Sequence, residues 1–292
     1  MGDNVIEADL IAVLVAVTNA EPRVLTLADG FSLPSGPLRT GHKSLQAGLR
    51  AWVEQQTHHP LGYVEQLYTF ADQRADAARS ISISYLGLSR EEAAKYPGAL
   101  WRSWYDYFPW EDTRNGTPCR AFLLDCLGKW AGNSAVRKAR IAGLFGAGPE
   151  WNDELVLQRY ELLWEVGIVA EARRDRVVAG PTVPGREMTH DHRRILATAI
   201  ARLRAKIKYR PVVFELLPRE FTLLELQQAM EALAGVNFHK PNFRRFIEQQ
   251  DLVEETGHFS SGLAGRPAKL FRFRAAVMDE RRLSGSKLPI VK

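Results

Sequence analysis

The sequence predicts an α+β fold of two domains, on the basis of three observations. Four segments rich in β-branched and aromatic residues occupy the first 88 residues and surround one amphipathic helix. A largely helical insertion follows, from about 89 to 188. The chain then ends in the order helix, helix, helix, β-hairpin, which is the order of a winged helix domain.

The first two strand segments are IEADLIAVLVAVT and RVLTLADG, which we expect to pair around a turn at 19–22. YVEQLYTFAD and SISISYLGLS form a second pair. Between the two pairs lies one helix, because apolar residues recur at spacings of three and four at Leu45, Leu49, Trp52 and Val53. The loop 33–36 contains glycine and proline and leads toward the start of this helix.

The insertion begins with an aromatic stretch, YPGALWRSWYDYFPW, which holds seven aromatic residues in fifteen. Such a stretch is more often a small core or a dimer surface than a ligand cage, because aromatic side chains dominate burial in cores and interfaces. NDELVLQRYELLWEV predicts an amphipathic helix that starts at Asn152 and Asp153 and stops at Gly167. PTVPG at 181–185 predicts a turn or linker.

A long basic helix, HDHRRILATAIARLRAKIKY, follows the insertion. Its predicted apolar face contains Ile195, Ala199, Leu203 and Ile207. RPVVFELLP predicts a short helix. FTLLELQQAMEALAG predicts another, which opens with Thr222 and Glu225 in the spacing of a capping box.

The last elements complete the winged helix. After a glycine-containing turn, KPNFRRFIEQQ predicts the recognition helix of a helix-turn-helix. LVEETG and PAKLFRFR predict two strands around the loop HFSSGLAGR. We therefore expect one domain over 1–209, which includes the insertion, and a winged helix domain over 210–292.

The overall composition is that of an ordinary folded protein of 292 residues, with 46% hydrophobic and 25% charged residues. The apolar run LIAVLVAV at 10–17 is too short to span a bilayer. It follows Asp3, Glu7 and Asp9 rather than a basic segment, so it is not a signal peptide. We expect a cytoplasmic protein without a membrane partner.

Cysteine and histidine usage argues against metal or catalytic sites. The chain has 2 cysteines, Cys119 and Cys126, which lie in a predicted helix at a spacing that places both on one buried face. Its 7 histidines form no metal-ligand pattern. His190 and His192 are two residues apart and point to different sides of a helix start.

The positive charge of the chain is concentrated near the C-terminus. The net charge is +5, yet residues 190–274 alone contain fifteen Lys and Arg against nine Asp and Glu, a surplus of six. This asymmetry suggests a nucleic-acid-binding module joined to a near-neutral domain. On charge alone, a solvated basic face without a polyanionic partner fits equally well.

The first turns of the predicted recognition helix carry the residues we expect to contact double-stranded DNA, because that end of the helix meets base edges. These are Lys240, Asn242, Arg244 and Arg245. Arginine suits guanine and asparagine suits adenine in the major groove. The neighbouring Phe243 and Phe246 are interpreted as core residues.

Three further residues are expected to contact DNA outside that helix. Arg266 stands between Gly265 and Pro267 in the wing, where a groove or phosphate contact is expected. Lys269 and Thr222 are expected to contact phosphates. For any one of these side chains, simple solvation is the alternative.

The stretch GPLRTGHKSLQAGLRAWVEQQTHH at 36–59 resembles a Nudix box, the pyrophosphohydrolase signature. Four positions match the pattern: Gly36, Arg50, Trp52 and Glu54. Five positions depart from it: His42, Ala51, Gln55, Thr57 and His58. The box normally gathers carboxylates on one helix face to hold divalent cations against a pyrophosphate. One remaining carboxylate cannot replace that cluster, so we expect no catalysis.

The motifs that follow make the resemblance broader. RLRAKIKYRPVVFELLP, FTLLELQQ, NFRRF, ETG and GRPAKLFRF occur in this order and closely resemble the Nudix-related regulators of NAD metabolism, the NrtR and NadQ type. The resemblance covers the first 88 residues and roughly the last hundred, and the long insertion fits the NadQ type better. It implies a Nudix-like sensor joined to a winged helix, in a repressor of NAD biosynthesis genes. Because one winged helix offers only a small base-contacting surface, we also expect a homodimer that reads a palindromic operator.

A Nudix fold without its metal carboxylates can still hold a pyrophosphate-linked nucleotide. We therefore expect an adenine nucleotide effector, NAD, ATP or ADP-ribose, beside Gly36, Arg39, Arg50 and Glu54, and no resident cofactor. Arg50 and Glu54 could instead form a surface ion pair of small worth.

Three other functions remain open. The chain could be a Nudix hydrolase acting on ADP-ribose or a related dinucleotide. Its winged helix could bind protein, or the Nudix-like domain could serve only as a dimerisation scaffold.

Overall fold

The computed structural model describes residues 7–62, 64–73, 79–91, 98–146, 151–176, 180–209, 212–260 and 267–274. At its centre is a mixed six-stranded sheet in the order β4-β5-β1-β2-β6, with β3 also paired to β1. The strands are β1 (Glu7–Thr18), β2 (Glu21–Thr26), β3 (Ser35–Pro37), β4 (Val64–Gln73), β5 (Arg79–Leu88) and β6 (Leu100–Ser103). β1 and β5 are parallel, and every other pairing in this sheet is antiparallel.

The β1–β2 hairpin confirms the first predicted strand pair. Its turn is tighter than expected, because β2 already starts at Glu21. Asn19 and Ala20 both have positive φ, 52° and 58°. Two consecutive positive φ angles are the conformation of the two-residue turns that match the twist of paired strands.

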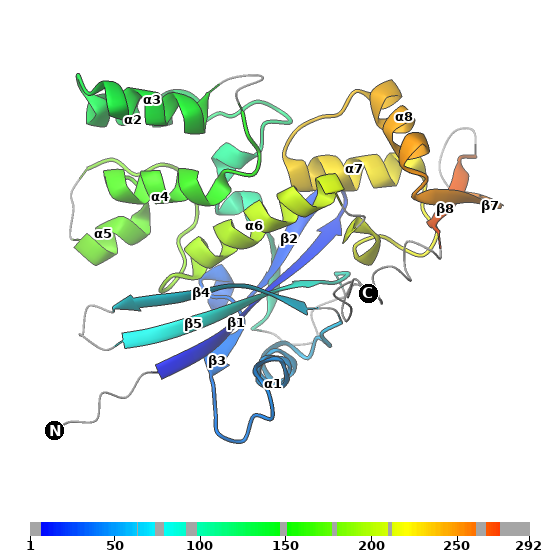
Figure 1. The fold of residues 1–292 in the computed structure, drawn as a ribbon, viewed down its shortest axis with the longest axis horizontal. Helices are drawn as coiled ribbons and strands as arrows, with labels where there is room; N and C mark the ends of the chain where they lie inside the picture. Colours follow the sequence, from blue (N-terminus) through cyan, green and yellow to red (C-terminus); the bar gives the residue numbers. More distant parts are fainter. Residues whose placement is uncertain are drawn as a thin grey trace, which may run out of the picture.

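Alternate residues of β1 supply two separate hydrophobic cores. Leu10, Ala12 and Leu14 face α1 (Leu45–Thr57), which covers one side of the sheet. Ile11, Val13 and Val15 face the helical layer on the other side. Figure 1 shows α1 below the sheet and the helices above it. The two-residue period of a strand explains this division, since successive side chains point to opposite faces.

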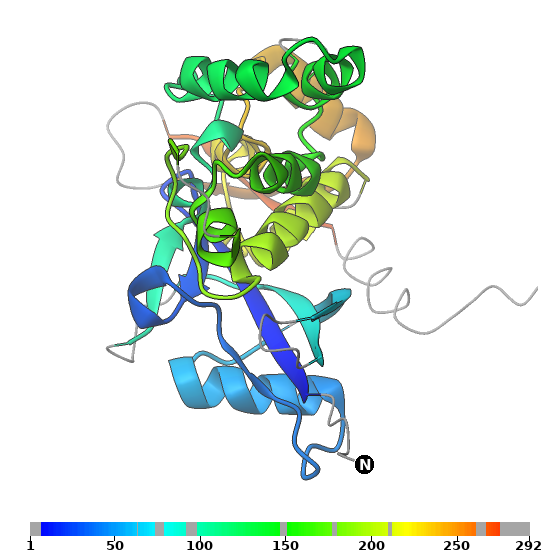
Figure 2. The same ribbon diagram turned by 90° about the vertical axis from the view of Figure 1, so that its left-hand side faces the viewer.

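The helical layer is formed by the insertion and the long basic helix (Figures 1 and 2). Its helices are α2 (Arg120–Ala131), α3 (Ala135–Phe145), α4 (Val156–Val166), α5 (Ala170–Arg176) and α6 (His192–Tyr209). α4 ends at Gly167, as predicted, but begins at Val156 rather than at Asn152. Cys119 and Cys126 are both buried, as predicted, and belong to the same hydrophobic core.

The aromatic stretch forms core, which confirms the first of its two interpretations. Its buried members are Trp104, Tyr105, Tyr107, Phe108 and Trp110. The predicted, mostly helical insertion at about 89–188 also contributes one strand to the sheet, because β6 lies within it and pairs with β2. That strand has only four residues, and its conformation is decided by the pairing partner rather than by its own pattern. The structure also describes short 3₁₀ helices before α2: η1 (Ala28–Gly30), η2 (Trp104–Asp106) and η3 (Pro109–Glu111).

The C-terminal elements have the predicted winged helix order. They are η5 (Val212–Glu215), α7 (Leu223–Ala234), α8 (Lys240–Gln250), β7 (Val253–Phe259) and β8 (Lys269–Phe273). Thr222 and Glu225 form the predicted capping box at the start of α7. β7 and β8 pair antiparallel, and Phe221 bridges to Phe271.

One hydrophobic core extends from the sheet through α4 and α6 into α7 and α8. It joins Val13 and Ile200 to Leu233 and Phe243 without a break. The domain boundary between 209 and 210 therefore stays a prediction based on sequence pattern. Within the described residues, no helix combines the length and the hydropathy that crossing a bilayer requires.

Candidate functional site

The outer face of α8 carries the residues expected to read DNA. Phe243 and Ile247 attach the helix to the core and are 5% and 3% exposed. Lys240, Asn242, Arg244 and Arg245 are all exposed. Among the described residues, no carboxylate forms an ion pair with Lys240, Arg244 or Arg245. Their charges are therefore available to a polyanion.

The interpretation of Phe246 as a core residue is wrong, because its side chain is 36% exposed. Phe243 and Ile247 are four residues apart and define the buried face of α8. Phe246 lies beside that face rather than in it. An aromatic side chain thus sits on the same surface as Asn242 and Arg245, where it is available to contact apolar base atoms.

The residues expected to bind phosphate have different surroundings. Thr222 is buried, and its hydroxyl accepts from the Glu225 amide at 3.1 Å and donates to the Glu225 carboxylate at 3.0 Å. Lys269 is exposed and its Nζ lies 2.9 Å from both carboxylate oxygens of Glu255. A phosphate would have to compete with these partners. Arg266 lies outside the described residues.

The expected nucleotide site is built around Trp52 rather than around charged groups. A Cβ on Gly36 would lie 2.3 Å from the indole ring, so only glycine allows the loop and helix to meet here. The indole Nε1 donates to the Pro37 carbonyl at 3.0 Å. The Arg39 guanidinium lies 4.3 Å from the ring centroid, in cation–π contact.

Arg50 and Glu54 lie on a different side of α1 from Trp52. The Arg50 guanidinium donates to the carbonyls of Leu61 and Gly62, the second at 2.8 Å, and so holds the loop that follows the helix. Glu54 is exposed. In place of the alternative ion pair between Arg50 and Glu54, Arg50 therefore forms hydrogen bonds to backbone carbonyls. The structure brings Gly36 and Arg39 together, but it separates them from Arg50 and Glu54.

The donor set does not fit the divalent cations of a Nudix enzyme. Ala51 and Gln55 are exposed on the face that also carries Glu54, so that face offers one carboxylate. His42 is occupied, since its Nδ1 accepts from the Arg39 amide at 3.2 Å. In the part of the chain that the structure describes, no group of three His, Cys, Asp or Glu residues could hold a metal.

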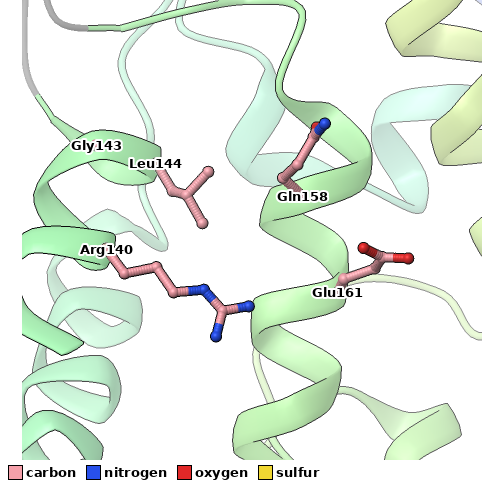
Figure 3. Close-up of a pocket in the computed structure, with 5 residues that line it drawn as sticks. All are labelled: Arg140, Gly143, Leu144, Gln158 and Glu161. Carbon is pink, nitrogen blue, oxygen red and sulfur yellow. The ribbon is translucent and has the colours of Figure 1, made fainter. Parts of the chain in front are cut away.

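A hollow of 380 Å³ lies elsewhere, between α3 and α4. Figure 3 shows Arg140, Gly143 and Leu144 on one side of it and Gln158 and Glu161 on the other. The two charged side chains already have partners, as Arg140 pairs with Glu165 and Glu161 pairs with Arg194. None of the residues expected to bind a nucleotide lines this hollow.

Sequence reasoning missed a fully buried cluster of charges between the two halves of the molecule. Glu111 pairs with Arg159 at 2.6 Å and with Arg204 at 2.7 Å, and all three side chains are 0% exposed. The signal available in the sequence was the position of Arg159 and Arg204 within helices that are otherwise rich in apolar residues. Arginine and glutamate are almost never fully buried unless paired.

Such pairs also explain much of the basic surplus in residues 190–274. Four cations of that segment pair with carboxylates outside it: Arg193 with Glu171, Arg194 with Glu161, Arg204 with Glu111 and Lys206 with Glu65. Four of the fifteen cations in this segment are therefore engaged by carboxylates elsewhere in the chain, and Glu111 shares its charge with Arg159. The DNA interpretation therefore depends on α8 rather than on the regional charge.

Among known protein families, a match is found for the C-terminal part of the chain. Residues 213–273 match the family model described as the NrtR DNA-binding winged helix domain. Over this range the chain is similar to that winged helix domain. A curated relative agrees: the ADPR responsive transcriptional repressor NtrR of Acinetobacter baylyi is 42% identical over 88 residues. That alignment covers 30% of this chain and 34% of the relative, so the chain matches about a third of the relative's length.

Solved structures extend the likeness to the whole fold. Shewanella oneidensis NrtR bound to a 27mer DNA matches with a TM-score of 0.56 and 21% identity, over 93% of this chain and 95% of that one. The same protein without DNA matches with a TM-score of 0.55 and 20% identity, over 91% and 94%. The chain thus shares the fold of that protein over nearly its whole length. Because the match spans nearly all of both chains, it does not favour the NadQ type over the NrtR type.

Proposed function

We propose that this protein is a transcriptional repressor that binds an operator through α8 and responds to an adenine nucleotide. The observation that carries the proposal is the basic start of α8, whose cations form no ion pair with the carboxylates that the structure describes, within an NrtR-type winged helix. Lys240, Arg244 and Arg245 are exposed on a helix that Phe243 and Ile247 anchor to the core. A rigid helix with free cations and an amide is what major-groove recognition requires.

The genes we propose as targets are those of NAD biosynthesis, as the resemblance to the NrtR and NadQ regulators implies. A chromosomal operator also means that the protein acts in the cytoplasm. We propose a homodimer that reads a palindrome, since one winged helix offers a small base-contacting surface and paired half-sites are the usual solution.

ADP-ribose is the effector we favour among NAD, ATP and ADP-ribose. The support is the printed description of the Acinetobacter relative as ADPR responsive. The Nudix-like domain is proposed to bind rather than to hydrolyse, because the helix face that holds cations in a Nudix enzyme keeps only Glu54. Gly36, Arg39, Arg50 and Glu54 remain proposed contacts, on two sides of α1.

DNA recognition is tested by selecting tight-binding duplexes from a randomised pool with the full-length protein. The selected duplex should be a palindrome, and its affinity should fall steeply with salt, because phosphate contacts release counterions. Arg244→Ala or Arg245→Ala should each weaken binding by roughly 1 to 3 kcal/mol. The matched control is Lys43→Ala, an exposed lysine two residues before α1. Figure 1 shows α1 on the other side of the sheet from α8.

The outcomes separate the competing functions. Failure to enrich any duplex, with binding that ignores salt, would point to a winged helix that binds protein. Enrichment without any nucleotide effect would leave the Nudix-like domain as a scaffold.

The effector is tested by calorimetry with and without operator. Linkage requires that ADP-ribose and operator alter each other's affinity by the same factor, about 5- to 150-fold in typical cases. Identical ADP-ribose affinity in both states contradicts the sensor.

A further inference from the structure

The C-terminal end of α7 is held by side chains from outside the winged helix. The Tyr105 hydroxyl donates to the Ala232 carbonyl at 2.6 Å. Arg204 Nε donates to the Leu233 carbonyl at 2.9 Å. The last four carbonyls of any helix lack intrahelical partners. Here two of them are bound by residues of η2 and α6 rather than by solvent or by α8.

The turn that follows α7 is fixed in the same way. The hydroxyl and the amide of Thr113 each donate to the Gly235 carbonyl at 2.8 Å. Gly235 has a φ of +72°, and a Cβ there would lie 2.2 Å from the Glu111 carbonyl and 2.9 Å from the Tyr105 hydroxyl. The turn between the two helices of the helix-turn-helix is therefore in direct contact with the aromatic segment.

Arg204 is itself rigidly placed. Its Nη1 lies 2.7 Å from the Glu111 carboxylate, and its Nη2 donates to the Glu111 carbonyl at 3.1 Å. Arg159 of α4 binds both oxygens of the same carboxylate, at 2.6 and 2.9 Å. Planar, bidentate arginine pairs fix geometry as well as charge. The positive guanidinium of Arg204 also faces the negative end of the α7 dipole.

These contacts connect the winged helix to the Nudix-like sheet. The residues on each side of the contact are close in sequence to β6 and to α8, respectively. β6 ends at Ser103, two residues before Tyr105, and pairs with β2 in the sheet. α8 begins five residues after Gly235. The end of α7 is therefore the place where the direction of α8 is set relative to the sheet.

We propose that Tyr105, Thr113 and Arg204, here called the α7 clamp, are positioning residues for operator recognition. They touch no DNA themselves. They hold the end of α7 so that α8 presents Arg244 and Arg245 at a fixed angle to the rest of the molecule. This proposal rests on the proposed function, because it assigns the clamp to the specific reading of DNA.

Specific and non-specific binding respond differently to such a clamp. Base readout requires side chains to meet base edges at fixed geometry, and a dimer must hold both recognition helices at the half-site spacing. Non-specific binding depends mainly on the number of cations that reach phosphates. Loosening the clamp should therefore lower operator affinity while leaving affinity for random DNA unchanged.

The test compares two tyrosine variants of the full-length protein. Tyr105→Phe removes the hydroxyl that donates to Ala232 and that accepts a longer bond, 3.4 Å, from Arg204. Tyr107→Phe removes a buried bond of the same length as the Ala232 bond, 2.6 Å, to the Gly30 carbonyl in the Nudix-like domain. Both variants should lose similar thermal stability. Only Tyr105→Phe should weaken binding to the selected operator, by about tenfold or more, with random duplex affinity unchanged.

Thr113 supplies an independent check if Tyr105→Phe folds poorly. Thr113→Val keeps the shape but removes the hydroxyl donor, and Thr113→Ser keeps the donor. Operator affinity should fall in the valine variant and be preserved in the serine variant. Equal operator affinity in wild type, Tyr105→Phe and Thr113→Val overturns the clamp, and so does an equal fall for operator and random duplex. If the wild type itself selects no duplex, the proposed function fails instead.

Discussion

Gly36 lies against the face of the Trp52 indole so closely that a Cβ at this position would be 2.3 Å from the ring. Trp52 is 9% exposed and belongs to the core beneath the sheet. The contact fixes β3 to α1, the two elements that carry the Nudix-like stretch. The glycine is thus explained by packing, whether or not a nucleotide binds nearby.

The first prediction follows from this contact. Gly36→Ala should destabilise the protein by about 1 to 3 kcal/mol, because overpacking forces the indole or the loop to move. Gly41→Ala is the matched control, since a Cβ there meets nothing within 4 Å. Urea denaturation measures both variants. Equal midpoints for the two would show that the indole adjusts without cost.

A second prediction separates the two phenylalanines of α8. Phe243→Ala should cost about 3 to 5 kcal/mol of stability, as is usual for a buried phenylalanine. Phe246→Ala should cost much less stability, because the side chain is 36% exposed, and should instead reduce operator affinity. Thermal unfolding and operator titration of both variants measure the difference. A large stability loss in Phe246→Ala would restore its interpretation as a core residue.

The third prediction concerns pH. His192 is buried, and its Nδ1 accepts from the Leu33 amide at 2.9 Å. Burial, with a smaller contribution from nearby His190, lowers the pKa of His192 to about 4 from its ordinary 6.5. Since the folded pKa is the lower one, the unfolded chain binds the proton more readily between these values. The stability that neutral His192 contributes is therefore present above about pH 6.5 and is lost as the pH falls toward about 4.

Wild-type protein should lose about 2 kcal/mol through this group between about pH 7.5 and about pH 5. His192→Asn keeps an acceptor for Leu33 and cannot titrate, so its stability should change less over the same range. Urea denaturation at the two pH values gives the comparison. Parallel losses in wild type and variant would remove His192 as the cause.

The fourth prediction concerns catalysis. With magnesium or manganese, the protein should release no AMP from ADP-ribose, because Ala51 and Gln55 supply no charge to a cation. Turnover near about 1 per second or faster would establish the hydrolase instead. Ala51→Glu combined with Gln55→Glu should gain measurable manganese affinity over wild type by calorimetry. An unchanged manganese affinity would mean that the cation site lacks further ligands besides those at positions 51 and 55.

Several elements could be predicted from the sequence because their causes are local. The two-residue alternation of β1, the capping box of Thr222 and Glu225, and the order of the winged helix all depend on residues close in the chain. The same holds for the exposed basic residues of α8, since a helix face follows from spacing alone.

Other features depend on partners far away in the sequence. β6 is a strand because β2 lies beside it, and Phe246 is exposed because Phe243 and Ile247 form the side of α8 that packs on the core. The basic surplus looked like a DNA-binding surface, but Arg193 and Arg204 are buried against Glu171 and Glu111. Net charge along a chain does not say which charges meet inside the fold.

The sequence by itself determined the fold class, the order of the elements and the loss of the Nudix carboxylates, because each follows from residue type and short-range spacing. Only the tertiary structure decided that Arg50 holds a loop, that Gly36 belongs to Trp52, and that Tyr105 and Arg204 bind the end of α7. Those contacts join residues up to 127 positions apart. The packing of α1 on one side of the sheet and of the helical layer on the other brings these residues together, and no local pattern encodes it.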